Sequence, residues 1–337
     1  MSHRTLGLFD QDTRYRKLEL LGDPLVTLNT IVPWSIFREA LEATRGTRDP
    51  KKGGRPRHDA VLMLKILVLR EVYGLSDEQV EFQIADRLSF QRFLGIGVEH
   101  TVPDYTAVWR FRERVKGGVM EELFARLGAY IDLAGFKAKK GQMLDASLVE
   151  KPRTRQPATP KEGEPALTPM QAAHRDADAN WTKKHGRSYF GYKNHIQADE
   201  GHGFILAYAV MPASVHDSQR AKELVDITRR GGKVYGDSAY HFAKLARHCA
   251  EHGLKDRTCF KAQANQPMTT QQQAWNKARS RVRAKVEHVF ARIDLFRQGR
   301  WLRCTGLARA TVCIGLINLV HNLRHLMTQR RMVMGTT

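Results

Sequence analysis

The hydrophobic pattern of the chain changes its period near Gln142, and this change constrains the fold more than any other feature. Before this point apolar residues recur every three or four positions, which is typical of helices. After it, short alternating runs indicate strands separated by helical segments. The sequence therefore predicts an all-α part followed by an α/β part. We expect an arm with a basic loop over residues 1–54, a helical domain over 55–136 and an α/β domain over 137–331.

Four helical patterns fill the expected N-terminal domain. The first, "DAVLMLKILVLREVYG", is apolar on nearly every side and predicts a central buried helix. A second runs from an N-cap at Ser76 to Gly95, a third begins near Asp104, and the fourth is "MEELFARLGAYIDLAGF". Short turns between helices suit a helix-turn-helix reader of DNA, and equally a plain helical bundle that serves as a scaffold. In the arm we expect one helix near "WSIFREALEAT", followed by the basic loop "RDPKKGGRPRH".

The part after Gln142 has a specific order of predicted elements. Three strands come first, "QMLDASLVEK", "RSYFGYKNHIQAD" and "GFILAYAVMPA", with a Pro-rich loop over 151–180 after the first. A helix over "HDSQRAKELVDITRRGG", the strand "KVYGDSAY", the helix "HFAKLARHCAEHG", the short strand "LKDRTCF" and a long basic helix from about residue 275 follow. This β-β-β-α-β-α-β-α order is that of the α/β ribonuclease-H-like fold, which places acidic residues on its first strand, its fourth strand and a late helix.

Positive charge is concentrated near the end of the chain. The whole sequence has 55 Lys and Arg against 35 Asp and Glu, a formal net charge of +20. From Trp275 onward, 13 Lys and Arg face only Glu287 and Asp294, so this segment contributes +11. Such clustering favours a nucleic-acid partner over the alternative, a basic protein of a basic proteome. The sequence begins without an apolar signal segment and has no membrane-length apolar run, so we expect a cytoplasmic protein with no membrane partner.

Two aspartates interrupt predicted strands. Asp145 lies within "MLDAS" and Asp237 follows "VYG", and the predicted topology places their strands side by side, about 4.8 Å apart. Taken singly, the first is explained as a strand residue that faces water, and the second as a turn or helix-capping residue. Taken together, two neighbouring carboxylates repel each other unless a cation lies between them. Mg²⁺, or Mn²⁺, prefers such oxygen ligands, and a pair of these ions catalyses phosphodiester displacement.

Glu287 is the third candidate ligand. It lies in a strongly basic predicted helix, four residues after Arg283. A simple ion pair at this spacing stabilises a helix by only about 0.2–0.5 kcal/mol. A metal ligand opposite the two aspartates accounts better for a lone glutamate among arginines. We therefore predict that Asp145, Asp237 and Glu287 together bind divalent metal ions, and that their basic neighbours contact phosphates.

The candidate DNA-binding side chains are basic residues of the long helix, of the second predicted strand and of the helical domain. They are Arg279, Arg281, Arg283, Lys285, Arg292, Lys193, Arg110 and Arg112. Arginine in the helical domain can read guanine edges, whereas the other side chains suit the phosphate backbone. Lys193 and His195 alternate on one strand face, so an exposed role without DNA contact explains them equally well. Asp217 is expected to be an N-cap.

The segment "HCAEH" is a weaker indication of metal binding. It contains His248, Cys249 and His252, which are ligand types for zinc. No second ligand pair follows at the spacing of a zinc finger, and a cluster of this kind on a helix usually lies at the surface. The four cysteines of the chain show no paired spacing, which indicates a reducing compartment without a disulfide framework.

Several segments, taken in their order along the chain, carry a family resemblance. They are "GRPRHDAVLMLKILVLREVYGLSDEQVEFQIADRLSFQRFLGI", "VPDYTAVWRFRERV", "GQMLDASLVEKPR", "TKKHGRSYFGYKNHIQAD", "MPASVHDSQ", "YGDSAY" and "RVRAKVEHVFARI". The set resembles the DDE transposases of bacterial insertion sequences, in the group called insertion-sequence family five, over most of the chain. The resemblance implies that Asp145, Asp237 and Glu287 are the catalytic triad, with Arg283 four residues before the glutamate.

The chain departs from the related signature at two positions. Ser280 stands where that signature has a Tyr, and Asp294 stands where it has a Lys. Arg292 or Arg297 is expected to take the place of the Lys. The three acidic residues themselves are present, so the resemblance implies an intact triad.

The resemblance also implies a reaction. A transposase of this kind uses Mg²⁺ or Mn²⁺ to cut DNA at the terminal inverted repeats of its element, and the released 3′-OH then attacks target DNA in the same site. Pairing two ends implies at least a dimer in the working complex. Two alternatives stay open: a sequence-specific DNA-binding regulator derived from a transposase, and a ribonuclease-H-like nuclease that only hydrolyses.

Overall fold

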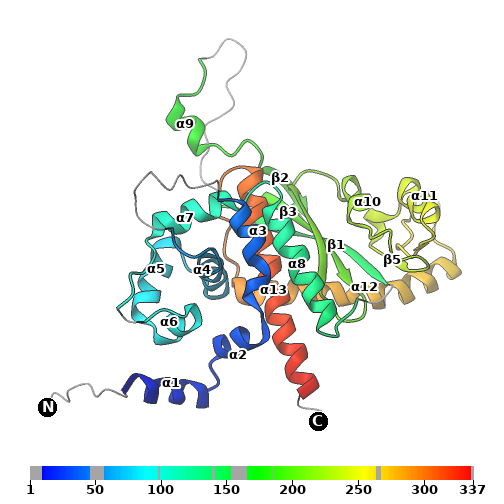
Figure 1. The fold of residues 1–337 in the computed structure, drawn as a ribbon. Helices are drawn as coiled ribbons and strands as arrows, with labels where there is room; N and C mark the ends of the chain where they lie inside the picture. Colours follow the sequence, from blue (N-terminus) through cyan, green and yellow to red (C-terminus); the bar gives the residue numbers. More distant parts are fainter. Residues whose placement is uncertain are drawn as a thin grey trace. The chain divides into compact units, whose positions relative to one another are not determined.

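The structure is a computed structural model of the chain, shown in Figure 1. The residues it describes are 10–45, 57–97, 99–138, 141–152, 165–184, 186–262 and 267–334. The predicted basic loop falls largely on residues 46–56 and much of the predicted Pro-rich loop on 153–164, so these parts lie outside the described residues. The chain divides into two compact units, Met1–Arg126 with Leu323–Thr337, and Leu127–Asn322.

The first unit is helical, which confirms the helical N-terminal region. Its elements are α1 (Asp10–Leu20), α2 (Pro24–Ile31), the 3₁₀ turn η1 (Trp34–Phe37), α3 (Arg38–Ala43), α4 (Ala60–Tyr73), α5 (Asp77–Asp86), α6 (Leu88–Leu94) and α7 (Tyr105–Arg114). Two further helices, α8 (Val119–Leu133) and α13 (Leu307–Met334), each contain residues of both units. The expectation of a single helix in the arm was wrong, because α1 and α2 precede the predicted one.

The helix α4 is the buried centre of the first unit, as its apolar sequence predicts. Asp59 caps it by accepting a hydrogen bond from Leu62 N at 2.9 Å, and Gly74 ends it in the left-handed conformation at φ 66°. Its buried side chains include Leu64 and Ile66.

The second expected helix of this unit is in fact two helices. Ser76 caps α5 in a capping box with Gln79, and Gly95 ends α6, as predicted. Between them Arg87 adopts an extended conformation, with φ −100° and ψ 115°, which separates α5 from α6. The hydrophobic period continues through this break, so the sequence pattern does not reveal it.

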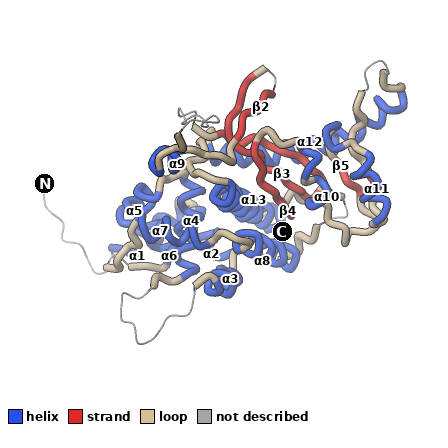
Figure 2. Tube along the Cα trace, turned by 90° about the horizontal axis from the view of Figure 1, so that it is seen from above, coloured by secondary structure: helices blue, strands red, loops and turns tan. Residues whose placement is uncertain are grey.

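The second unit is built on a mixed sheet, which has six strands within the described residues (Figure 2). They are β1 (Gln142–Glu150), β2 (Asn180–Lys184), β3 (Arg187–Asp199), β4 (Ile205–Pro212), β5 (Lys233–Tyr235) and β6 (Lys255–Asp256). β3 pairs antiparallel with β1, β2 and β4, and β5 pairs in parallel with β1 and β6. The predicted mixed α/β arrangement is confirmed, with β1 at the centre of the sheet.

The helical segments of the second unit depart from the prediction in length. They are α9 (Pro169–His174), η2 (Asp217–Gln219), α10 (Ala221–Leu224), η3 (Ser238–Tyr240), α11 (Ala243–Glu251) and α12 (Thr270–Arg297). The prediction of one long helix over 216–232 was wrong, because this segment contains only the short η2 and α10. The Asp226 side chain accepts hydrogen bonds from the amide and hydroxyl of Thr228, and this local turn competes with a helix. α9 lies in the segment that was expected to be a loop, and β2 lies where no strand was expected, because six and five residues are too few to show a clear hydrophobic period.

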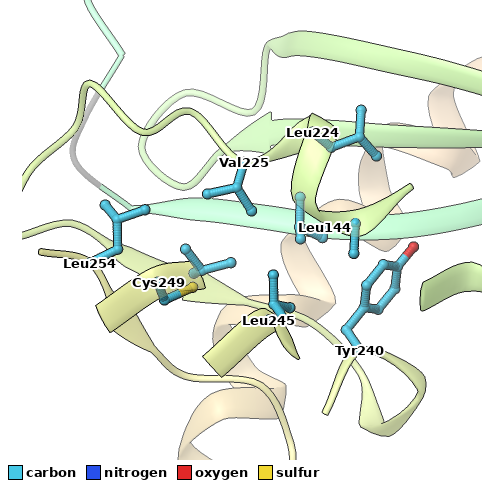
Figure 3. Packing of buried hydrophobic residues seen from close by; sticks show 9 residues of the cluster. Leu144, Leu224, Val225, Tyr240, Leu245, Cys249 and Leu254 are labelled. Atoms are coloured by element: carbon cyan, nitrogen blue, oxygen red, sulfur yellow. The ribbon is translucent and has the colours of Figure 1, made fainter. Parts of the chain in front are cut away.

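The side chains of β1 alternate between two buried clusters. On one face Leu144 packs with residues of α10, η3 and α11, and Figure 3 shows its side chain close to Leu245. On the other face Val149 packs with Ile314 of α13. Asp145 shares the face of Val149, because the two are four residues apart in the strand. Among the described residues, no helix has both the length and the apolar character that crossing a membrane requires.

Candidate active site

Asp145 lies in the middle of the central strand, with 15% of its side chain exposed. Its Oδ1 accepts a hydrogen bond from Ala146 N at 2.8 Å. Burial, with a smaller contribution from the Asp237 carboxylate, raises the pKa of Asp145 to about 6 against the opposing effects of the Ala146 amide and of Arg283. A buried carboxyl with a raised pKa marks a position where additional positive charge is favourable.

Asp237 follows the end of β5, the strand that pairs in parallel with β1. Met143 of β1 is opposite Tyr235 of β5, so Asp145 and Asp237 each lie two residues further along their own segment. Asp237 also caps η3, where its Oδ1 accepts a hydrogen bond from Ala239 N at 2.8 Å. The capping role expected of an isolated aspartate is therefore present, and it leaves the second carboxylate oxygen out of the cap.

Glu287 lies on α12, and 57% of its side chain is exposed. Arg283, one turn earlier, donates a hydrogen bond from Nη2 to Glu287 Oε1 at 2.8 Å. The Nη1 of the same side chain lies 3.7 Å from Asp145 Oδ2. One guanidinium therefore contacts two carboxylates, one on a strand and one on a helix, that are far apart in the sequence. Asp237 is close to the strand carboxylate, Asp145.

The donor atoms of this region are carboxylate oxygens, which are the preferred ligands of Mg²⁺ and Mn²⁺. The residues fit such an ion, because a divalent cation would offset the repulsion between the buried Asp145 and its neighbour Asp237. Arg283 supplies positive charge at this place. Within the described residues, the one set of three His, Cys, Asp or Glu ligand atoms that all lie within 4.8 Å of one another is elsewhere, on α11.

Three of the basic residues predicted to contact DNA are bonded inside their own unit. Lys193 donates to Asp217 Oδ1 at 2.8 Å, and Arg112 donates to Asp77 Oδ1 at 2.7 Å. Arg279 donates to a backbone carbonyl at 2.6 Å and lies over two aromatic rings. The fold therefore fixes the position of these side chains.

The other predicted DNA-contacting residues, apart from Arg283, are exposed. Arg110 is exposed on α7, and α12 exposes Arg281, Lys285 and Arg292. Lys285 also donates a hydrogen bond to the carbonyl of Glu200 at 3.1 Å. α12, the helix that carries Glu287, thus has exposed positive charge along it.

A buried polar network on β3 was missed by sequence reasoning. His195 is fully buried, with Nδ1 3.4 Å from the hydroxyl of Tyr240 and Nε2 3.9 Å from Asp217 Oδ1. Burial lowers the pKa of His195 to about 4, with Lys193 adding to the decrease and Asp217 opposing it. The capping role expected of Asp217 was wrong, because His216 caps η2. The sequence placed Lys193 and His195 on one strand face, but nothing in it linked that face to Tyr240 or Asp217.

Two family matches cover most of the chain. The family described as "Transposase DDE domain" matches residues 138–323, and the family described as "Transposase domain (DUF772)" matches residues 13–114. The first match alone spans more than half of this chain, so the chain belongs to the DDE transposase family. The resemblance inferred from the sequence is confirmed, and the α/β unit is of the ribonuclease-H-like superfamily. The family cuts and joins DNA and generally uses divalent metal ions.

The individual proteins that the chain is similar to share only a small part of its sequence. The chain is 27% identical over 216 residues to the transposase for insertion sequence element IS1106 of Neisseria meningitidis serogroup B, covering 60% of this chain and 74% of that protein. It is similar to a solved piggyBac transposase synaptic complex with hairpin DNA at 10% identity and a TM-score of 0.45, covering 93% of this chain and 76% of that chain. A pre-cleavage Mos1 transpososome gives 10% identity and a TM-score of 0.19, covering 86% and 84%.

Proposed function

We propose that this chain is the transposase of an insertion sequence, which cuts DNA at the ends of its element and joins the released 3′-OH to target DNA. The observation that carries the proposal is the contact of Arg283 with both Asp145 and Glu287, close to Asp237, in a chain of the DDE transposase family. Carboxylates gathered around one position are what metal-assisted phosphodiester chemistry requires. The relative named as an insertion-sequence transposase supports the assignment.

The triad residues have distinct roles in this proposal. Asp145, Asp237 and Glu287 would hold Mg²⁺ or Mn²⁺, which when bound activates an attacking oxygen and stabilises the leaving oxygen of a phosphodiester. Asp145 is the buried ligand on the rigid central strand, and the cap of η3 orients Asp237. Arg283 orients Glu287 through its 2.8 Å hydrogen bond and balances the negative charge of the carboxylates.

DNA is the proposed partner of both parts of the chain. Exposed Arg281, Lys285 and Arg292 on α12 contact phosphates, together with Arg283. The helical segment at 55–136 recognises the terminal inverted repeats, and the segment at 137–331 binds the DNA backbone and carries out the chemistry. At least two chains act together, because two ends of the element must be cut.

Within the helical segment, Arg110 is the side chain proposed to read bases. It is exposed on α7, and an arginine can bind a guanine edge through two hydrogen bonds. Arg112 is bonded to Asp77 and instead helps to hold α7 in place. Lys193 and Arg279 likewise act by positioning, since the fold already uses their donor atoms.

The test is a cutting assay with purified full-length protein and labelled DNA that carries the ends of the element encoding it. With Mg²⁺ or Mn²⁺ we expect nicks at the terminal repeats that leave a 3′-OH, followed by transfer of the label to a target plasmid. A chelator should stop both steps. Binding to the ends without cutting in either ion would contradict the proposal and favour a DNA-binding regulator. Cutting without joining would favour a nuclease that only hydrolyses.

A further inference from the structure

The C-terminal end of α11 carries a second group of potential ligands, which has no part in the proposed reaction. His248, Glu251 and His252 each offer one ligand atom, and these atoms lie within 4.8 Å of one another. Spacings of three and four residues place the side chains on the same side of the helix end. The two histidines are half-buried and the glutamate is exposed, so the group lies near the surface of its unit.

Among the described residues, each of the two histidines has a ring nitrogen, Nε2, that no hydrogen bond occupies. His252 Nδ1 lies 2.9 Å from the carbonyl oxygen of His248, which can only accept, so Nδ1 carries the proton and Nε2 the lone pair. A bond of this kind commonly orients a metal-binding histidine. His248 Nε2 is buried and has no hydrogen-bond partner among the described residues. A buried polar atom without a partner is uncommon in a folded protein, and a bound ion would supply the missing interaction here.

The local charges also suit a cation. α11 ends at Glu251 with His252 as its C-cap, so the partially negative carbonyl end of the helix lies at this group. Glu251 adds a negative charge, which the nearby Lys222 of α10 partly offsets.

We propose that His248, Glu251 and His252 form a binding site for Zn²⁺ or a chemically similar transition-metal ion. Two imidazole nitrogens and one carboxylate oxygen suit zinc, whereas Mg²⁺ prefers oxygen ligands alone. Three protein ligands leave the fourth position of a tetrahedral ion for water. The bound ion joins the last turn of α11 to its C-cap, and it stabilises the chain just before β6. The site is independent of the reaction proposed for Asp145, Asp237 and Glu287.

The test is a zinc titration of the full-length chain after metal removal with a chelator. A coloured zinc indicator competes for the ion, and excess Mg²⁺ occupies sites made of oxygen ligands alone. We expect one tightly bound Zn²⁺ per chain. Loss of a group that merely orients a ligand costs about 10–100-fold in metal affinity, so the double variant His248→Gln/His252→Gln should bind zinc at least about 100-fold more weakly. Glu251→Gln should give a smaller loss.

Two control variants distinguish zinc binding at this site from zinc binding elsewhere on the chain. His100→Gln removes a histidine from a different part of the chain, and Asp237→Asn removes a carboxylate of the proposed catalytic site; both should bind zinc as the wild type does. Circular dichroism shows whether each variant is folded, and Co²⁺ in place of Zn²⁺ should give the visible spectrum of a tetrahedral site. The proposal is overturned if the wild type binds no stoichiometric zinc, or if the histidine double variant binds it as tightly as the wild type.

Discussion

The two groups of candidate ligands in the α/β unit differ in how the chain builds them. The carboxylate group takes Asp145 from β1, Asp237 from the end of β5 and Glu287 from α12, so it exists only when three elements pack correctly. The histidine group takes its ligands from α11 and its C-cap. The carboxylate group therefore forms only when the core is correctly packed. The histidine group depends mainly on the formation of one helix end.

The two groups also differ in donor chemistry and in burial. The carboxylate group offers only oxygen atoms and includes a mostly buried member, Asp145, whose ionisation is costly. The histidine group offers two nitrogens and one oxygen, and its members are half-buried or exposed. The first is therefore matched to Mg²⁺ or Mn²⁺ and the second to zinc. The same protein should respond to the two kinds of ion in separable ways.

The largest expected effect is on DNA cutting by variants of the carboxylate group. Asp145→Asn, Asp237→Asn and Glu287→Gln should each slow cutting at the element's ends by at least about 1,000-fold, because metal-assisted stabilisation of the transition state is worth several kcal/mol. DNA binding should persist, measured as a band shift. The histidine double variant is the matched control and should cut at the wild-type rate. A triad variant that cuts as fast as the wild type would remove its residue from the site.

The next effect is on stability, and it distinguishes the two groups by ion. At a zinc concentration 100 times its Kd, binding to the folded chain should raise the free energy of unfolding by about 2.7 kcal/mol. Urea denaturation should show this increase for the wild type and for Asp145→Asn, and should not show it for His248→Gln/His252→Gln. An equal increase in all three proteins would mean that zinc binds elsewhere.

The buried carboxyl of Asp145 should make stability depend on pH when metal is absent. Its pKa of about 6 in the folded chain lies above the value of an unfolded Asp, about 3.9, so the folded state favours the protonated form. This stabilisation is fully present below about pH 4 and is lost as the pH rises through 6. Between these pH values the wild type should lose stability relative to Asp145→Asn by an amount on the order of 2 kcal/mol. Urea denaturation in a chelator would measure it, and a difference that does not vary with pH would contradict it.

The smallest effect concerns the salt dependence of DNA binding. If Arg281 contacts a phosphate, Arg281→Ala should make the log–log slope of affinity against salt shallower by about 0.9. Arg247→Ala, an exposed arginine on α11, is the control and should leave the slope unchanged. Equal slopes for both variants and the wild type would mean that this face of α12 does not contact DNA.

Local sequence patterns predicted the carboxylate group because its members break those patterns. Asp145 interrupts an apolar strand, Asp237 ends another, and Glu287 is the exception in a basic helix. Arg283 was predictable as the helical neighbour of Glu287, whereas its contact with Asp145 depends on how α12 packs on β1. The fold was likewise predictable only in part. Changes in the hydrophobic period mark helices and strands, but they do not show that Arg87 separates α5 from α6.

Contacts between distant residues were not predictable. Arg112 bonds to Asp77, 35 residues away, and Lys193 bonds to Asp217, 24 residues away. Nothing in the period of either segment identifies the partner, so both basic residues were assigned to DNA. In "HCAEH" the sequence drew attention to the cysteine, but that side chain packs in the hydrophobic core and Glu251 takes its place as the third potential ligand.

The most direct test of the central claim, that three separated carboxylates form one metal site, is anomalous diffraction from crystals of the full-length chain soaked in Mn²⁺. We expect an anomalous peak in contact with the carboxylates of Asp145 and Asp237, on the side from which Glu287 approaches. The same soak of Asp145→Asn crystals should lose or weaken the peak. Mn²⁺ bound only at the α11 histidines, or absent from the aspartates at saturating concentration, would contradict the claim.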